Sequence, residues 1–340
     1  MKKILVTGAA GFIGYHVTKN LLDKNYTVYG IDNLNNYYDV SLKKNRLNEI
    51  YKHKKSENFK FSKMDICDIK ELEILFKEQK FDVVINLAAQ AGVRYSLENP
   101  HAYLKSNLEG FINILECCRH NSIEHLIYAS SSSVYGNNTK LPFHEDDPVD
   151  HPISLYAATK KSNELLAHTY SHLFQLPCTG LRFFTVYGPW GRPDMAMYLF
   201  ADAIKNDRPL KLFNRGDMLR DFTFVDDISE SIIRLCEHKP TQLIGWNSNQ
   251  PLASASSSPY RVYNIGNNKP IYVKDLLNKM ESFFNKKAII IHEDIQPGDV
   301  PATYADITYL NNDIQFTPKT SIEQGLNLFL NWYQDYNNKV

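Results

Sequence analysis

A glycine-rich segment near the N-terminus constrains the fold more than any other feature of the sequence. Residues 7–14 read TGAAGFIG, directly after a short apolar run at 3–7 and at the start of a stretch with helical spacing. At such a junction Gly8 permits a tight turn, Gly11 lets the backbone approach a pyrophosphate, and Gly14 lets helix and strand pack closely. The segment therefore predicts a strand–turn–helix unit whose helix N-terminus binds phosphate.

Short apolar runs alternate with helical stretches through the first half of the chain, which is the pattern of a parallel sheet with crossover helices. The helical stretches include 14–24 and 69–79, and the predicted strands are at 3–7, 27–32, 60–63, 83–87, 126–129 and 179–183. We therefore expect an α/β fold with a doubly wound, parallel Rossmann-type sheet.

The length of 340 residues exceeds the usual size of one hydrophobic core, so two lobes are expected. We place a dinucleotide-binding Rossmann domain at 1–183 and a smaller α/β C-terminal substrate-binding lobe at 184–340, with segments able to cross between them. In the second part, helical stretches are predicted at 226–237 and 273–285. The segment 246–259, rich in small and polar residues, is predicted to be a mobile surface loop.

Composition argues against several classes of function. Lys plus Arg number 38 and Asp plus Glu also number 38, so no global field favours nucleic acid or a membrane surface. The five cysteines show no CxxC spacing and are interpreted as reduced, mostly buried thiols without a metal or disulfide role. The N-terminal apolar run is too short for a membrane span, and glycines interrupt it where a signal peptide is continuous. We expect a cytoplasmic protein.

Two carboxylates follow predicted strands and are candidates for a dinucleotide site. Asp32 ends the second strand, 18 residues after Gly14, close to the spacing of a carboxylate that binds a ribose diol. Because a carboxylate repels a 2′-phosphate and the neighbouring Asn33 is uncharged, NAD is favoured over NADP. Asp65 follows the third strand and is either a partner of the adenine amino group or part of a helix N-cap near Asp68.

A tyrosine and a lysine stand four residues apart in a predicted helix, in the string YAATK. This spacing puts Tyr156 and Lys160 on one helix face. An ammonium group beside a phenol, together with a positive nicotinamide ring, favours the phenolate, which is a base able to take a proton from a sugar hydroxyl. The serine run in YASSSSVYG, at 128–136, follows another strand and supplies hydroxyls at the same edge of the sheet.

Together these motifs resemble the extended branch of the short-chain dehydrogenase/reductase superfamily over nearly the whole chain. The family's order is kept by TGAAGFIG, DN at 32–33, NLAAQAGVRYS at 86–96, SSVYG at 132–136 and YAATK at 156–160. The resemblance implies that Ser131, Tyr156 and Lys160 form the catalytic triad. It also implies an NAD site that includes, besides Gly8, Gly11, Gly14, Asp32, Asn33 and Asp65, the residues Phe12, Ile13, Ile66, Leu87, Ala88 and Ala89, with Tyr156 and Lys160.

The resemblance extends to the substrate lobe. Arg220, in LRDFTFVDDI, matches an arginine that clamps a UDP pyrophosphate, a task that suits a guanidinium group. Asp299 matches a residue near the uridine ribose, Phe213 is expected against the uracil, and Arg94 is expected to contact the UDP-sugar. The plain structural alternatives are an Arg220–Asp221 surface pair and a core position for Phe213.

The string GRPDMA at 191–196 discriminates among sugars, because it resembles UDP-glucuronate 4-epimerases more closely than galactose epimerases. The resemblance implies reversible inversion of C4 of a UDP-hexuronic acid through a 4-keto intermediate. The candidate donors for the C6 carboxylate are Ser132, Ser133, Thr185 and Arg192, although Arg192 alternatively braces this loop from behind. Ser132 and Ser133 also replace the Asp–Glu pair of the family's sugar dehydratases, which argues against dehydration.

Other activities remain as alternatives. Within enzymes they are a UDP-galactose or UDP-N-acetylhexosamine 4-epimerase and a UDP-glucuronate decarboxylase, and outside enzymes an inactive NAD-binding scaffold. A 4-keto hexuronate is a β-keto acid, so an epimerase must hold its carboxylate out of alignment with the carbonyl π system. The resemblance further implies a homodimer that forms through helices near 102–120 and 154–174.

Overall fold

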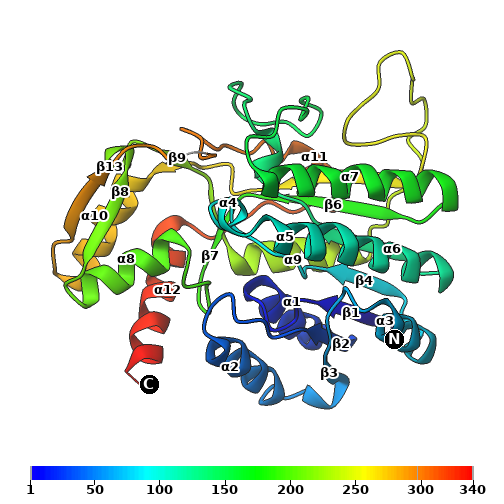
Figure 1. Ribbon diagram of the computed structural model, residues 1–340, viewed down its shortest axis with the longest axis horizontal. Coiled ribbons are helices and arrows are strands. Elements are labelled where there is room, and N and C mark those ends of the chain that lie inside the picture. Colours follow the sequence, from blue (N-terminus) through cyan, green and yellow to red (C-terminus); the bar gives the residue numbers. More distant parts are fainter. Residues whose placement is uncertain (1, 297, 339–340) are drawn as a thin grey trace.

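The computed structural model of the protein describes residues 2–296 and 298–338, and its centre is a seven-stranded parallel sheet (Figure 1). The strand order is β11-β6-β5-β4-β1-β2-β3. The bounds are β1 Lys3–Thr7, β2 Thr27–Asp32, β3 Phe59–Lys63, β4 Val83–Asn86, β5 His125–Ala129, β6 Cys178–Phe183 and β11 Tyr260–Ile265. The predicted doubly wound α/β fold is confirmed, and each of the six predicted strands ends within one residue of its predicted position.

Helices cover both faces of this sheet, as a parallel sheet with buried strands requires. Ile4 and Val6 of β1 face one hydrophobic cluster, and Leu5 faces the other, because successive side chains of a strand point to opposite faces. The first face is covered by α1 (Phe12–Asp23), α2 (Val40–Tyr51) and α9 (Val225–Cys236). The second face is covered by α3 (Ile69–Gln79), α6 (Gly110–His120) and α7 (Leu155–Phe174).

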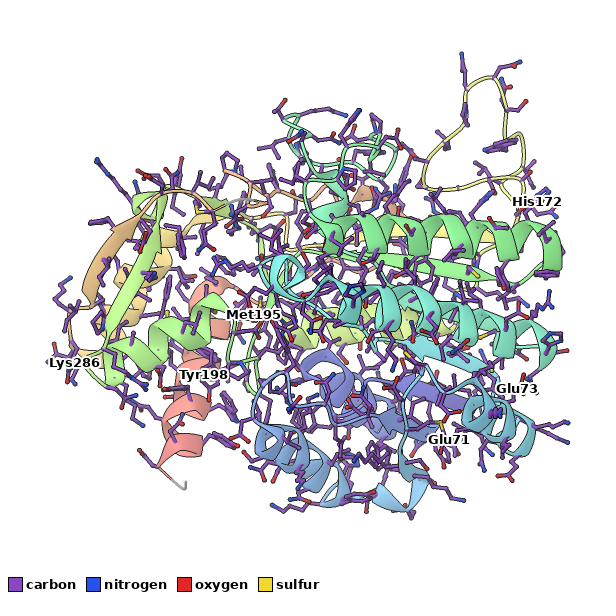
Figure 2. The ribbon with its side chains drawn as sticks, in the orientation of Figure 1. Glu71, Glu73, His172, Met195, Tyr198 and Lys286 are labelled. Carbon is purple, nitrogen blue, oxygen red and sulfur yellow. The ribbon has the colours of Figure 1, made fainter. Side chains whose placement is uncertain are left out.

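The small lobe has its own core beside the sheet (Figure 1). It consists of helices and short strand pairs: α8 Ala196–Lys205, α10 Val273–Phe284, α12 Ile322–Asn337, β8 Pro209–Phe213 with β13 Ile289–Glu293, and β9 Leu219–Arg220 with β12 Ile271–Tyr272. Met195 lies where this lobe meets the central sheet (Figure 2). Strand β11 and helix α9 come from the second half of the chain but belong to the layers of the central sheet.

The segment 246–259 lies in a loop that projects from the molecule beside the end of α7 (Figure 1). Its last part is anchored by buried serines. The Ser254 hydroxyl donates to Asp146 (2.6 Å), and Ser256 forms a hydrogen bond with His168 (3.0 Å). The predicted surface position is therefore correct for its first part, whereas the last residues pack against α7.

The cysteines are mostly buried. All five cysteines are free, four of them are buried, and Cys67 is half-buried. Within the described ranges no helix combines the length and apolar character needed to cross a bilayer. No group of three His, Cys, Asp or Glu side chains arranged for a metal ion is found in this part of the chain.

Candidate active site

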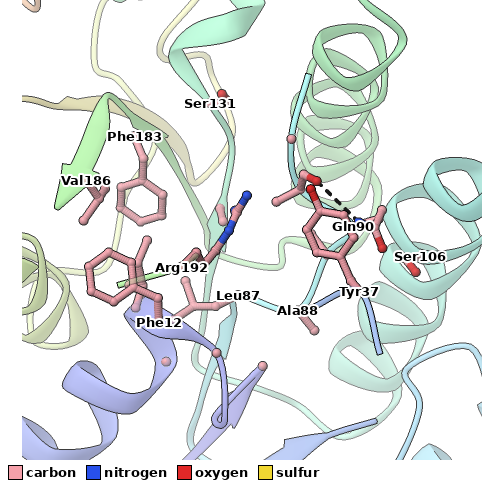
Figure 3. A pocket seen from close by; sticks show the side chains of 18 of the residues that line it. Phe12, Tyr37, Leu87, Ala88, Gln90, Ser106, Ser131, Phe183, Val186 and Arg192 are labelled. Carbon is pink, nitrogen blue, oxygen red and sulfur yellow. Dashed lines mark hydrogen bonds between the residues drawn. The ribbon is translucent and has the colours of Figure 1, made fainter. Parts of the chain in front are cut away.

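A cavity of about 410 Å³ opens at the carboxyl ends of the central strands, between the sheet and the small lobe (Figure 3). Ligands of doubly wound folds bind at this edge. The cavity lining includes every residue predicted from the family's NAD site. It also includes the catalytic candidates and four of the eight substrate candidates, Ser132, Ser133, Thr185 and Arg192.

The glycine-rich turn is packed so closely that a side chain does not fit. Gly8 has a φ of +69°, and a Cβ there would lie 2.9 Å from the Ala88 nitrogen. A Cβ at Gly14 would lie 2.0 Å from the Gly8 carbonyl oxygen. Helix α1 follows Gly11, its N-cap, and no side chain caps its first N–H groups. The turn thus directs the N-terminus of α1 at the cavity, and it fits a pyrophosphate held by backbone N–H groups.

Asp32 lies in the cavity wall at the end of β2, with only 8% of its surface exposed. Its Oδ1 accepts a hydrogen bond from the Leu34 N–H (2.8 Å) and lies 4.0 Å from Lys43 Nζ. Burial raises the pKa of Asp32, while the charge of Lys43 and the Leu34 N–H oppose the rise. A buried carboxylate with free acceptor capacity at this position fits a ribose diol.

The sequence left open whether Asp65 belongs to a helix N-cap or faces the adenine, and the hydrogen bonds of Asp65 and Asp68 distinguish these two possibilities. The Asp68 side chain caps α3 by accepting from the Glu71 N–H (3.2 Å). Asp65 lines the cavity, where its Oδ2 accepts from the Asn33 amide (3.1 Å) and its Oδ1 from the Cys67 N–H (2.9 Å). The helix cap therefore belongs to Asp68, and Asp65 faces the space next to Ile66 where an adenine ring is expected.

Helix α7 brings the catalytic candidates into the cavity. It begins after Ser154, whose side chain accepts from the Ala157 N–H (3.1 Å), and this cap fixes the turn that carries Tyr156. Lys160 lies one turn later, almost completely buried, and its Nζ donates to the Ala129 carbonyl oxygen (2.8 Å). Burial lowers the pKa of Lys160 to about 8.

Burial and two neighbouring groups act on the pKa of Tyr156. Burial raises the pKa of its phenol, while a hydrogen bond with Ser131 and the charge of Arg192 oppose the rise. The sequence predicts that Lys160, together with a nicotinamide ring, lowers this pKa. In the structure the Lys160 Nζ donates to the Ala129 carbonyl oxygen and lies 6.0 Å from the centroid of the Tyr156 ring. In the protein itself Arg192 is the cation that favours the phenolate.

The serine run forms one side of the cavity next to Tyr156. Ser131 is the N-cap of a short 3-10 helix, Ser132–Tyr135, and its Oγ accepts from the Ser133 N–H (3.2 Å). The Ser131 hydroxyl also donates to Ser133 Oγ (3.1 Å). Thr185, at the start of β7 (Thr185–Tyr187), faces the same space, and its N–H donates to the Asp221 carbonyl oxygen (3.1 Å).

Arg192 extends into the cavity rather than bracing the loop from behind (Figure 3). Its Nε donates to Asp194 Oδ1 (3.0 Å), and a second nitrogen contacts Asp194 Oδ2. Tyr37 donates to the same carboxylate (3.1 Å). Arg192 is therefore a cation of the site, and Asp194, two residues further along the chain, is its counter-ion.

The other four substrate candidates form a separate cluster outside the cavity lining. Arg220 Nη2 donates to Asp299 Oδ1 (2.7 Å), and the guanidinium of Arg94 lies 4.7 Å from the centroid of the Phe213 ring. The Arg220–Asp221 alternative is wrong, because Asp221 is completely buried and accepts hydrogen bonds from backbone N–H groups. Phe213 is only half-buried and is therefore not a core residue.

This outer cluster lies next to the cavity. Gly298 packs against Val93, since a Cβ added there would lie 3.1 Å from Val93 Cγ1. Val93 lines the cavity, and Arg94 and Asp299 are the chain neighbours of these two residues. The arrangement offers two guanidinium groups and one aromatic ring close to the mouth of the cavity.

Several residues of the site could not be recognised from the sequence. Lys43 and Tyr37 line the cavity from the segment after β2, and Asp194 pairs with Arg192. Behind the serines, the fully buried Arg182 forms a bidentate ion pair with Glu164 (2.9 and 3.0 Å). Only Asp194 had a signal, its place inside GRPDMA. The others depend on contacts between distant segments.

A phosphate-binding turn, a buried carboxylate at the ribose position and a Ser–Tyr–Lys set at one cavity define an NAD-dependent enzyme of the short-chain dehydrogenase type. The comparison with family models agrees. Residues 4–266 match the model of the NAD dependent epimerase/dehydratase family, and the chain belongs to that family.

Curated relatives and solved structures match the chain over almost its full length. Protein CapI of Staphylococcus aureus is 54% identical and aligns over 99% of this chain and 100% of its own. A probable UDP-glucuronate 4-epimerase of Rhizobium meliloti is 44% identical, over 98% of each chain. The crystal structure of a UDP-glucuronic acid 4-epimerase from Bacillus cereus, in complex with UDP-glucuronic acid and NAD, superposes with a TM-score of 0.86 at 32% identity, and the match covers 98% of this chain and 99% of that one.

Proposed function

We propose that the protein inverts C4 of UDP-glucuronate to give UDP-galacturonate, reversibly and through a transient 4-keto sugar, with tightly bound NAD. The observation that carries the proposal is the lining of the cavity around Tyr156. Three hydroxyl groups, those of Ser132, Ser133 and Thr185, and the Arg192 guanidinium gather there. These groups fit a sugar that carries a carboxylate next to the reacting carbon. The names of the Rhizobium relative and of the Bacillus structure support the same substrate.

The cofactor site is proposed to hold NAD as the sequence predicts. The turn from Gly8 to Gly14 and the N-terminus of α1 would hold the pyrophosphate, Asp32 the adenosine ribose, and Asp65 the adenine amino group. When bound, NAD supplies the acceptor and donor of hydride for C4. Lys160, which ends in the cavity next to Ala129, would donate to the nicotinamide ribose.

Tyr156 is proposed to take the proton of the 4-hydroxyl group and later to return it. Its phenol has the Ser131 hydroxyl and the Arg192 charge as partners that favour the ionised form. Ser131 is also proposed to donate to the oxygen that becomes the ketone. General base catalysis of this kind typically contributes roughly 10²–10⁴-fold to the rate.

The outer cluster is proposed to keep UDP anchored while the keto sugar turns over. Arg220 and Arg94 would bind the pyrophosphate, Phe213 the uracil, and Asp299 the uridine ribose. Because this cluster lies beyond the cavity that contains Tyr156, a sugar can rotate about its phosphate linkage without release of UDP. Return of hydride to the opposite face then gives the inverted C4 centre.

The carboxylate arrangement distinguishes epimerisation from decarboxylation. Hydroxyl donors on one side of the cavity hold the C6 carboxylate in a fixed plane without a strong unpaired cation. Keeping the C5–C6 bond out of alignment with the C4 carbonyl preserves the β-keto acid. UDP-galactose and UDP-N-acetylhexosamine epimerisation do not need this set of donors, and they remain the second choice.

We also propose a cytoplasmic homodimer with an NAD-binding domain at 1–183 and a UDP-sugar lobe at 184–340. Free cysteines fit a reducing compartment. Helices α6 and α7 lie side by side (Figure 1) and expose large apolar side chains, which suits the predicted pairing face. These side chains are Ile112, Leu165 and Leu173.

A deuterium label tests the proposed route. UDP-glucuronate with deuterium at C4 is incubated with the protein, and the product is analysed by NMR. The proposal predicts UDP-galacturonate that keeps the label at C4 and takes up no solvent hydrogen at C4 or C5. Loss of the label to solvent would contradict hydride transfer at C4, and the Tyr156→Phe variant serves as the control for turnover by this site.

A further inference from the structure

Asp194 and the backbone at Gly92 fix the position of Arg192 from two sides, and the proposed catalytic cycle gives neither of them a role. Its guanidinium forms the ion pair with Asp194, and its Nη2 lies close to Gly92, 3.9 Å from where a Cβ on that residue would be. The Tyr37 hydroxyl donates to Asp194 Oδ2 (3.1 Å) and also abuts Gly92, 2.9 Å from the same point. Gly92 has a φ of +101°, and its carbonyl oxygen accepts a hydrogen bond from Tyr103.

The backbone next to Arg192 is fixed as well. Arg46 of α2 is completely buried, and its guanidinium donates to the carbonyl oxygens of Trp190 (2.6 and 3.1 Å) and Gly191 (3.3 Å). It also donates to the Ala10 carbonyl oxygen in the phosphate-binding turn (3.0 Å). Arg46, like Tyr37, belongs to the segment that follows β2. The cofactor half of the chain therefore positions the loop that carries Arg192.

Asp194 is ionised in this arrangement. Burial opposes its ionisation, but the charge of Arg192 and the hydrogen bonds from Arg192 and Tyr37 outweigh burial and hold the pKa of Asp194 below its usual range. The pair thus has almost no net charge, although Arg192 alone is a full cation near Tyr156. A buried or half-buried cation without its partner would act strongly on any charge that develops at the reacting oxygen.

The competing reaction of a 4-keto hexuronate develops such a charge. The C5–C6 bond breaks, CO2 leaves, and the electron pair of that bond enters the C4–C5 bond to give an enolate with its negative charge on O4. A proton from solvent then reaches C5, and return of hydride to C4 gives a UDP-pentose. An unpaired cation near O4 stabilises the enolate and so accelerates this route.

We propose that Asp194 and Tyr37 are positioning residues that tie down Arg192 and neutralise its charge, and that they thereby suppress decarboxylation of the 4-keto intermediate. The inference rests on the proposed function, because only a UDP-hexuronate can lose CO2 in this way. Asp194 acts on charge and position, whereas Tyr37 acts through the orientation of the Asp194 carboxylate. Removal of Asp194 is therefore the stronger perturbation.

The test is the partition of products from UDP-glucuronate, measured by NMR and by CO2 release. Asp194→Asn leaves Arg192 unpaired, and the ratio of UDP-pentose to UDP-galacturonate is expected to rise about tenfold or more, the change that ~1.4 kcal/mol produces. Tyr37→Phe is expected to shift the ratio in the same direction by a smaller factor. The double variant Arg192→Gln, Asp194→Asn removes the unpaired cation that stabilises the enolate, so its ratio is expected to lie below that of Asp194→Asn alone.

Two matched variants control for general disturbance. Tyr95→Phe removes a phenol next to Tyr37, with ring centroids 4.9 Å apart, and Asp207→Asn removes an exposed ion pair with Lys286 (2.8 Å). Neither is expected to change the product ratio. An unchanged ratio in both Asp194→Asn and Tyr37→Phe, with total turnover merely reduced, would overturn the inference.

The remaining outcomes are also decisive. If Asp194→Asn does not fold, the Tyr37→Phe ratio decides alone. If the native protein epimerises UDP-glucuronate while the variants keep its ratio, the inference falls and the proposed function stands. No turnover of UDP-glucuronate by the native protein would remove both.

Discussion

Replacement of Glu145 by glutamine tests the framework behind the active site through its titration. Glu145 is completely buried, and its Oε1 accepts a hydrogen bond from the Asn264 N–H (2.8 Å). Its Oε2 has no hydrogen-bond partner within the described part of the chain. Burial raises the pKa of Glu145 from the ordinary 4.5 to about 7, against the opposing effects of the Asn264 N–H and the Arg182 charge.

The raised pKa determines the sign of the effect on stability. Between about pH 4.5 and pH 7 the folded protein binds more protons at this group than the unfolded chain does, so the free energy of unfolding falls as the pH rises. The stabilisation that comes from this proton uptake is complete below about pH 4.5 and is lost above about pH 7. A pKa of about 7 in place of 4.5 corresponds to about 3 kcal/mol. A glutamine at this position would keep the acceptor for the Asn264 N–H and would not titrate. The free energy of unfolding of the Glu145→Gln variant is therefore not expected to show this fall with pH.

The assay is thermal unfolding of both proteins from about pH 5 to pH 8. The Tm of the variant relative to that of the native protein is expected to rise by about 4 °C over this range, since a chain of this length shifts by roughly 1.4 °C per kcal/mol. Glu78→Gln, on the exposed face of α3, is the control, because water solvates that carboxyl in both states. A Tm difference that stays constant with pH in Glu145→Gln would refute the reasoning.

Three further predictions concern the site. Tyr156→Phe removes the base and is expected to lower kcat about 10²–10⁴-fold at unchanged Tm, and wild-type kcat in this variant would contradict the assignment. Asp32→Ser removes the charged acceptor of the ribose diol, which is expected to cost ~1.5–3 kcal/mol of binding free energy. The Kd of NAD in titration calorimetry is therefore expected to rise about 10–100-fold. An unchanged Kd would place the ribose elsewhere. Arg220→Lys keeps the ion pair with Asp299 but loses the guanidinium fork, so KM for UDP-glucuronate is expected to rise about tenfold with little change in kcat, whereas a fall in kcat alone would show a role in the chemical step.

The strands and the cofactor turn were accessible from the sequence because their signals are local. Parallel strands buried on both faces are continuous apolar runs, and the glycine spacing of the turn follows from close backbone contacts. This is why β1 and β2 have the predicted bounds. The return of β11 to the central sheet has no such signal, because its pairing with β6 joins segments far apart in the chain.

The residues of the site likewise divide into those with a local sequence signal and those that depend on contacts between distant segments. The i, i+4 spacing of Tyr156 and Lys160 placed both at one cavity without knowledge of the fold. The burial of Tyr156 and the Lys160–Ala129 hydrogen bond both act on the pKa of the Tyr156 phenol, and neither could be predicted from the sequence because both depend on tertiary packing. The contact of Tyr37 with Asp194 joins segments 157 residues apart and was likewise out of reach.

The most direct test of the central claim is to incubate the purified protein with UDP-glucuronate, without added NAD, and to identify the products by NMR. We expect UDP-galacturonate with little UDP-pentose, because the protein retains its NAD from turnover to turnover. UDP-pentose and CO2 as the main products would make the protein a decarboxylase. Conversion of UDP-glucose to UDP-galactose, with UDP-glucuronate left unchanged, would contradict the assignment of the substrate.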